Sequence, residues 1–141
     1  MNGNTFLGQE WQTLQDNHER YEASALLIKL ASLALAVAGL ASGLALAWIG
    51  LVVVLCWGQE GILKTYQARL GERLLRIEAL LRQPEPPTLA AMQLHSEWAA
   101  QRPGVIGLLA GYAASACRPT VAFPYAPLLI AGALAKVFSW A

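Results

Sequence analysis

The residues from Ser24 to Trp57 are almost wholly apolar, and Lys29 is their only charged side chain. As one straight helix rising about 1.5 Å per residue, this stretch would extend about 50 Å, well beyond a hydrocarbon core of about 30 Å. A break at Ala41-Ser42-Gly43 divides it into two arms of about 25 Å each, which match a bilayer with little tilt. The stretch therefore predicts a transmembrane helical hairpin, with membrane helices over residues 24–41 and 44–60.

A second interpretation of the same stretch is a single tilted helix that dimerises. Gly39 and Gly43 are four residues apart and Ala47 extends the series, and small residues at this spacing let helix backbones approach closely in lipid. We favour the hairpin because apolar stripes of matching period lie on both sides of the break.

These stripes lie in residues 1–23 and 61–83, where apolar side chains recur at intervals of three and four, the period of one helix face. The spacing predicts one helix from about Thr5 to Ala41 and another from about Leu44 to Gln83. Folded back at the break, the helices form an antiparallel coiled coil outside the membrane. Its seam is expected to contain Leu7, Trp11, Leu14, His18, Tyr21, Tyr66, Leu70, Leu74, Ile77 and Leu81.

The pairing across this seam follows from the position of the break. Leu14 should lie near Leu70, Trp11 near Leu74, and Leu7 near Ile77 or Leu81. The expected fold is therefore an all-α membrane protein: a transmembrane helical hairpin extended into a cytoplasmic antiparallel coiled coil, plus a C-terminal hydrophobic helical segment.

The rest of the chain is divided by prolines and glycines. Arg118 separates the last two apolar runs and is expected at a membrane surface, because a charge at the bilayer centre is costly. The second of these runs should be helical from about Tyr125. The expected segments are a proline-rich linker (84–87), a short amphipathic helix (88–102), an interfacial or re-entrant helix (105–117) and a third membrane segment (121–140).

Composition supports a membrane location and excludes several functions. Hydrophobic residues make up 56% of the 141 residues and charged residues 13%, about half the share usual in soluble domains. The net charge of +1 gives no reason to expect a nucleic-acid partner. Cys56 and Cys117 have no metal-binding or disulfide spacing, and are expected to be buried or lipid-facing thiols.

The distribution of basic residues predicts the orientation. Arg20 and Lys29 flank the first arm, five Lys and Arg residues follow the second within residues 61–83, and the turn carries none. By the positive-inside rule, both ends of the hairpin face the cytoplasm, with Trp57 as an aromatic anchor at the interface. We therefore expect an integral protein of the bacterial inner (cytoplasmic) membrane with a cytoplasmic N-terminus.

Two kinds of polar residue could carry function. Lys29 and Glu60 fall at nearly the same depth in the hairpin, and could form an intramembrane ion pair that handles a proton or an ion. The plainer interpretation, which we favour, is that each extends separately to the interface. His18 is expected to set the register of the seam, and His95 to be an ordinary surface residue, because neither has the spacing of a zinc site.

No nucleophile elbow, phosphate-binding loop or dinucleotide fingerprint is present. We therefore expect no catalytic residues, no bound cofactor and no enzymatic activity. The layout of residues 5–83 resembles small bacterial two-helix membrane effectors of the SLATT type; the resemblance is one of architecture, so it implies no residue roles.

The sequence favours a non-enzymatic membrane protein that acts by assembly, as a scaffold or regulatory subunit of a membrane complex. Its expected partners are the lipid bilayer and either itself or other membrane-protein subunits. The alternative is an oligomeric pore or channel-like effector. Against a wide aqueous pore, only Ser32 and Ser42 bear hydroxyl groups between Leu30 and Trp57.

Overall fold

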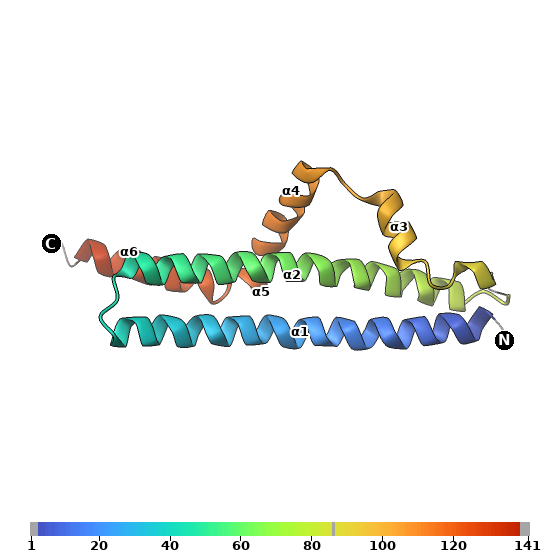
Figure 1. The fold of residues 1–141 in the computed structure, drawn as a ribbon, viewed down its shortest axis with the longest axis horizontal. Coiled ribbons are helices and arrows are strands. Elements are labelled where there is room, and N and C mark those ends of the chain that lie inside the picture. The colour runs from blue at the N-terminus through green and yellow to red at the C-terminus, as the bar shows by residue number, and fades with distance from the viewer. Residues whose placement is uncertain (1–2, 86, 139–141) are drawn as a thin grey trace.

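A computed structural model describes residues 3–85 and 87–138, and all regular structure in these residues is helical. Two long helices dominate the molecule (Figure 1). The elements in chain order are α1 (Gly3–Ala41), α2 (Leu46–Leu81), the 3-10 helix η1 (Thr88–Ala90), α3 (Leu94–Gln101), α4 (Val105–Ala116), α5 (Pro119–Ala122) and α6 (Tyr125–Phe138).

Helices α1 and α2 lie side by side and antiparallel along almost their full length (Figure 1). The connection between them is short, and Gly43 adopts a left-handed φ of 70° there, a conformation that costs glycine little. Backbone bonds from Ser42 to Ala38 and from Leu44 to Gly39 close the end of α1. The two long helices and the break between them are therefore close to the predicted bounds.

At the end of the helix pair that lies away from the turn, the seam between α1 and α2 is apolar. Leu7, Leu14, Leu74 and Ile77 are buried, and Trp11, Leu70 and Leu81 pack against them. His18 and Tyr21 are half-buried, whereas Tyr66 lies outside the seam with 43% of its surface exposed. Polar residues take the positions between these apolar layers.

The region expected as one short helix over residues 88–102 is interrupted. Met92 adopts a left-handed φ of 58° between η1 and α3. The Met92 N–H donates to Glu10 on α1 at 2.7 Å, and the Ala90 carbonyl accepts from Arg73 on α2 at 2.7 Å. The backbone groups on either side of the break are therefore satisfied by the long helices, and a continuous helix does not form.

The C-terminal apolar runs form separate short helices. α4 projects from the middle of α2, and α6 runs along the other half of α2 toward the turn (Figure 1). The expected segment 121–140 is divided between α5 and α6, with α6 beginning at Tyr125 as expected; residues 139–140 lie outside the described part. α6 extends about 21 Å at 1.5 Å per residue.

The half of the molecule near the turn has an apolar surface. Large apolar side chains are exposed on α1 from Leu26 to Leu40, on α2 from Trp48 to Leu55, and on α6 from Ile130 to Phe138. By length and composition alone, α1 and α2 could cross a membrane, with mean hydropathies of 2.0 and 1.7 over their most apolar windows. Only 17% and 22% of these windows are buried, unlike the core helix of a soluble protein.

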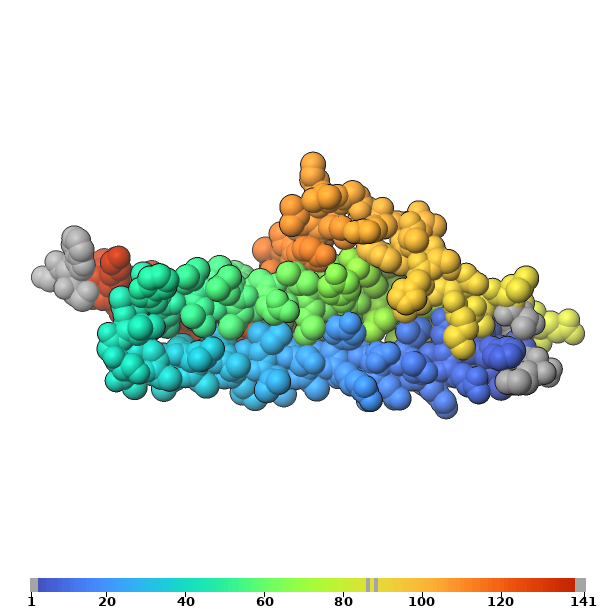
Figure 2. All heavy atoms as spheres, viewed as in Figure 1, coloured from blue at the N-terminus to red at the C-terminus, as the bar shows by residue number. Residues whose placement is uncertain are grey.

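Figure 2 shows how unevenly the long pair is covered. The short helices α3 and α4, in yellow and orange, stand against one side of α2, while the outer side of α1, in blue, carries no second layer in this view. In this view α3 and α4 leave most of the apolar half of the hairpin uncovered, and α6 packs on α2 in that half.

Candidate functional site

The most unusual polar group in the apolar half of the molecule is the carboxylate of Glu60. Its side chain is fully buried. Tyr125 at the start of α6 donates its hydroxyl to Glu60 Oε2 at 2.7 Å, and Lys29 Nζ on α1 lies 3.1 Å from Glu60 Oε1. Three helices therefore each contribute one polar side chain to a single cluster, named here the Glu60 cluster.

The surrounding contacts hold this cluster in place. Lys29 Nζ also donates to the Thr120 carbonyl at 2.6 Å, and Trp57 Nε1 donates to the Ala116 carbonyl at 2.9 Å. The Trp57 and Tyr125 rings stack with their centroids 6.3 Å apart. These contacts hold the segment between α4 and α6 against α1 and α2.

The interpretation favoured from the sequence was that Lys29 and Glu60 extend separately to the interface. The structure instead brings the two side chains together, as in the alternative interpretation. Glu60 Oε1 meets Lys29 as an ion pair without hydrogen-bond geometry. Ser32, fully buried one turn along α1 from Lys29, has a hydroxyl oxygen with no hydrogen-bond partner among the described residues. Tyr125, Thr120 and Ser32 were not predicted as part of a site.

The contacts of the Glu60 cluster hold α1, α2 and α6 together. The carboxylate and the ammonium group offset each other's charge, and burial strengthens their attraction while making the loss of either partner costly. The part of the chain that the structure describes holds no group of three or more His, Cys, Asp or Glu side chains suited to a metal ion.

A second buried polar cluster lies at the opposite end of the hairpin, and is named here the Arg73 cluster. Arg73 is 2% exposed and donates through Nε and Nη2 to Glu10 at 2.9 and 3.0 Å. Its Nη1 donates to Glu97 on α3 at 2.6 Å, and Glu97 also accepts from Arg76 at 2.6 Å. One guanidinium thus joins α1, α2, η1 and α3.

The sequence prediction missed the Arg73 cluster because the seam that it expected contained no arginine. A usable signal was present, since the pairing that brings Leu14 near Leu70 also brings Glu10 near Arg73. A buried guanidinium is tolerated where planar bidentate bonds satisfy it, as Glu10 does here.

A third polar contact lies between these two clusters. Lys64 donates to Glu22 at 2.6 Å, and buried Gln67 donates to Glu22 at 2.8 Å and to the His18 carbonyl at 3.1 Å. The Lys64 bond, helped by Gln67, holds the pKa of the Glu22 carboxyl below its usual value. His18 therefore meets α2 at Gln67 through its backbone carbonyl.

The remaining residues singled out in the sequence have simpler surroundings. His95 on α3 is exposed, and with Trp98, Tyr66 and Arg69 it lines a surface cavity of about 460 Å³. Cys56 is half-buried and Cys117 exposed, and both thiols are free. Arg118 is exposed just before α5.

Together these contacts define an all-helical protein with two long apolar helices that polar side chains bridge at several levels. No protein-family model, curated protein or solved structure matches the chain.

Proposed function

We propose that this chain is an integral membrane protein whose apolar half crosses the bilayer as a three-helix bundle of α1, α2 and α6. The support is the belt of exposed large apolar side chains on these helices, which would be unfavourable in water. Within it, α1 after Lys29 and α2 before Glu60 carry no charge. The other half, with its exposed Glu, Lys and Arg residues, forms a helical stalk in the cytoplasm.

The proposed orientation places the stalk in the cytoplasm of a bacterial cell and the turn at Ser42-Gly43 on the opposite face. Most of the basic residues lie on the stalk side, which supports it. Lys136 near the end of α6 lines the same cleft as Leu40 and Leu46, so the turn side also carries a cation that the sequence prediction did not assign to it.

Thiol labelling tests this orientation. With Cys56 and Cys117 replaced by serine, a Ser42→Cys variant in intact cells should react with a membrane-impermeant maleimide. A cysteine at Gln15, which is half-buried on the stalk, should react only after the cells are opened. Labelling of position 42 only after lysis would reverse the orientation, and labelling of both positions in intact cells would contradict the membrane hairpin.

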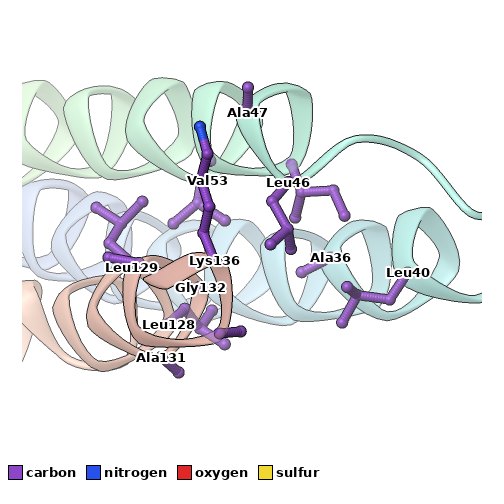
Figure 3. A pocket seen from close by; sticks show the side chains of 14 residues that line it. Ala36, Leu40, Leu46, Ala47, Val53, Leu128, Leu129, Ala131, Gly132 and Lys136 are labelled. Atoms are coloured by element: carbon purple, nitrogen blue, oxygen red, sulfur yellow. The ribbon is translucent and has the colours of Figure 1, made fainter. Parts of the chain in front are cut away.

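We propose further that the protein acts by assembly, as a scaffold or regulatory subunit of a membrane complex. One observation carries this proposal: a cleft of about 430 Å³ lies between α1, α2 and α6 in the apolar half. Figure 3 shows Leu128, Leu129 and Gly132 of α6 across from Leu46 and Val53 of α2. The small residues of its lining are Ala36, Ala47, Gly50, Ala131, Gly132, Ala133 and Ala135.

Small residues matter in this setting because lipid offers no hydrophobic driving force for helix association. Helices in a membrane associate mainly through close packing, which small side chains permit. The buried charge of Glu60 is already paired within this chain, so the cleft is the part of the apolar half best suited to receive a helix from another subunit.

Filling the cleft tests the proposal. A Cβ at Gly132 would meet no atom within 4 Å, and the same holds for Gly58, which lies on α2 outside the cleft. Gly132→Leu should therefore reduce the assembled fraction seen by native mass spectrometry after gentle detergent extraction, whereas Gly58→Leu should not.

The outcomes of that experiment separate the interpretations. A partner subunit lost in Gly132→Leu and retained in Gly58→Leu supports the scaffold. A homo-oligomer with the same pattern supports self-assembly and makes ion flux in liposomes the next measurement. Equal assembly of both variants and the wild type would refute the cleft as the assembly surface.

A further inference from the structure

The helix α4 presents apolar side chains that nothing in the described chain covers. Val105, Ile106 and Leu109 are 73%, 85% and 60% exposed. α4 touches α2 through its C-terminal half, where Ala116 lies against Gly61 and the Ser115 hydroxyl accepts from Thr65 at 2.8 Å. Its first turns project away from the long pair (Figure 1).

The depth of α4 follows from the proposed membrane crossing, on which this inference rests. A hydrocarbon layer of about 30 Å corresponds to about 20 helical residues. Counted from the turn, such a layer ends near Glu22 on α1 and near Thr65 on α2. Because α4 packs on α2 between Gly61 and Thr65, it lies at the stalk-side edge of the bilayer, at the level of the headgroups.

Two arginines border a cleft at the base of this helix. The cleft has a volume of about 300 Å³, lies between α2, α3 and α4, and is lined by Arg69, Arg118 and Trp98 among others. The Arg69 guanidinium carbon lies 3.5 Å from the centre of the Trp98 ring and 4.7 Å from that of Tyr66. A guanidinium that stacks on an aromatic ring can still donate hydrogen bonds from the N–H groups at the edge of its plane.

The positive charge of the two arginines in this cleft is not offset by ion pairs among the described residues. Among the described residues, no carboxylate lies within ion-pair distance of Arg69 or Arg118, whereas Arg73 and Arg76 are bonded to glutamates. Glu72 also lines the cleft, but its side chain is 68% exposed and its nearest cation is Arg76 at 3.9 Å.

We propose that this cleft binds the phosphate group of an anionic phospholipid from the stalk-side leaflet. Arg69 and Arg118 donate to the phosphate oxygens, and the acyl chains lie against the exposed apolar side chains of α4. Arginine suits this role because its planar fork matches phosphate oxygens, and a long side chain such as that of Arg118 reaches from an apolar segment to the headgroup level.

Lipid titration of the purified full chain in neutral detergent, read by native mass spectrometry, tests this proposal. The probes are phosphatidylglycerol and phosphatidylcholine with identical acyl chains. The wild type should bind phosphatidylglycerol more tightly. Arg118→Gln and Arg69→Gln should each weaken that binding about five-fold and weaken phosphatidylcholine binding less, because the choline ammonium already offsets the charge of that lipid's phosphate. Arg82→Gln, an exposed position at the end of α2, should change neither.

Equal affinity for the two lipids, or equal phosphatidylglycerol binding by the Arg69, Arg118 and Arg82 variants, would overturn the proposal. Arg118→Gln carries the test if Arg69→Gln unfolds, because exposed Arg118 has no ion-pair partner to lose among the described residues. Alkaline washing of native membranes separates the two levels of inference. A chain that is released refutes the membrane crossing, whereas a chain that is retained without lipid preference refutes only the lipid site.

Discussion

Replacing Arg73 with leucine is expected to lower the free energy of unfolding by about 3–5 kcal/mol. The physical reason is the carboxylate left behind: Glu10 is 5% exposed and would lose the one cationic partner that it has among the described residues. The Ala90 carbonyl and one oxygen of Glu97 would lose a donor as well. Unfolding of the purified protein in mild detergent, induced by a denaturing detergent and followed by circular dichroism, measures the change.

Arg76→Leu is the matched control for this variant. Arg76 lies one turn along α2 and also donates to Glu97 at 2.6 Å, but 40% of its side chain is exposed. Its removal should cost no more than about 1 kcal/mol, the usual range for solvent-exposed pairs. Equal losses in the two variants would contradict the idea that burial of the Glu10 charge dominates.

A double variant separates the charge from the packing. Glu10→Leu in the Arg73→Leu background leaves no unpaired carboxylate in the seam, so part of the lost stability should return. The recovery should be incomplete, because Glu10 also accepts from the Met92 N–H, and Glu10→Leu leaves this donor without its acceptor.

The long helices were predictable because their signals are local. Apolar length, the small residues at the break and the prolines after Gln83 bear directly on where a helix can run and end. The list of expected seam residues left out polar side chains that interrupt the apolar period. Gln67 and Arg73 are buried although they are polar, because partners on α1 satisfy them, and a rule based on periodicity treats such residues as solvated.

The arrangement after Pro87 could not be derived in the same way. Whether a run of about 12 apolar residues lies on a surface, packs on a helix or enters a bilayer depends on contacts distant in sequence. The hydrogen bond from the Tyr125 hydroxyl to Glu60 is such a contact, and so is the hydrogen bond from the Met92 N–H to Glu10. Neither leaves a local pattern around the residues that it joins.

Replacing Lys29 with methionine is expected to destabilise the apolar half by about 3–5 kcal/mol. Methionine keeps the length and apolar stem of the side chain but leaves Glu60, which is fully buried, with the Tyr125 hydroxyl as its remaining partner. The Thr120 carbonyl loses its donor too, so the segment that leads into α6 should loosen. The same detergent unfolding experiment measures the loss.

Lys64→Met is the control, because Lys64 also bridges α2 to a glutamate of α1 but its partner is solvated. Glu22 keeps 66% of its side chain exposed and water can replace the lost ammonium, so the cost should stay near about 1 kcal/mol. Adding Glu60→Gln to Lys29→Met removes the unpaired charge and should recover much of the loss. If Lys29→Met and Lys64→Met lowered the free energy of unfolding by equally small amounts, water would have to reach Glu60. The Glu60 cluster would then not be a buried contact that holds α1, α2 and α6 together.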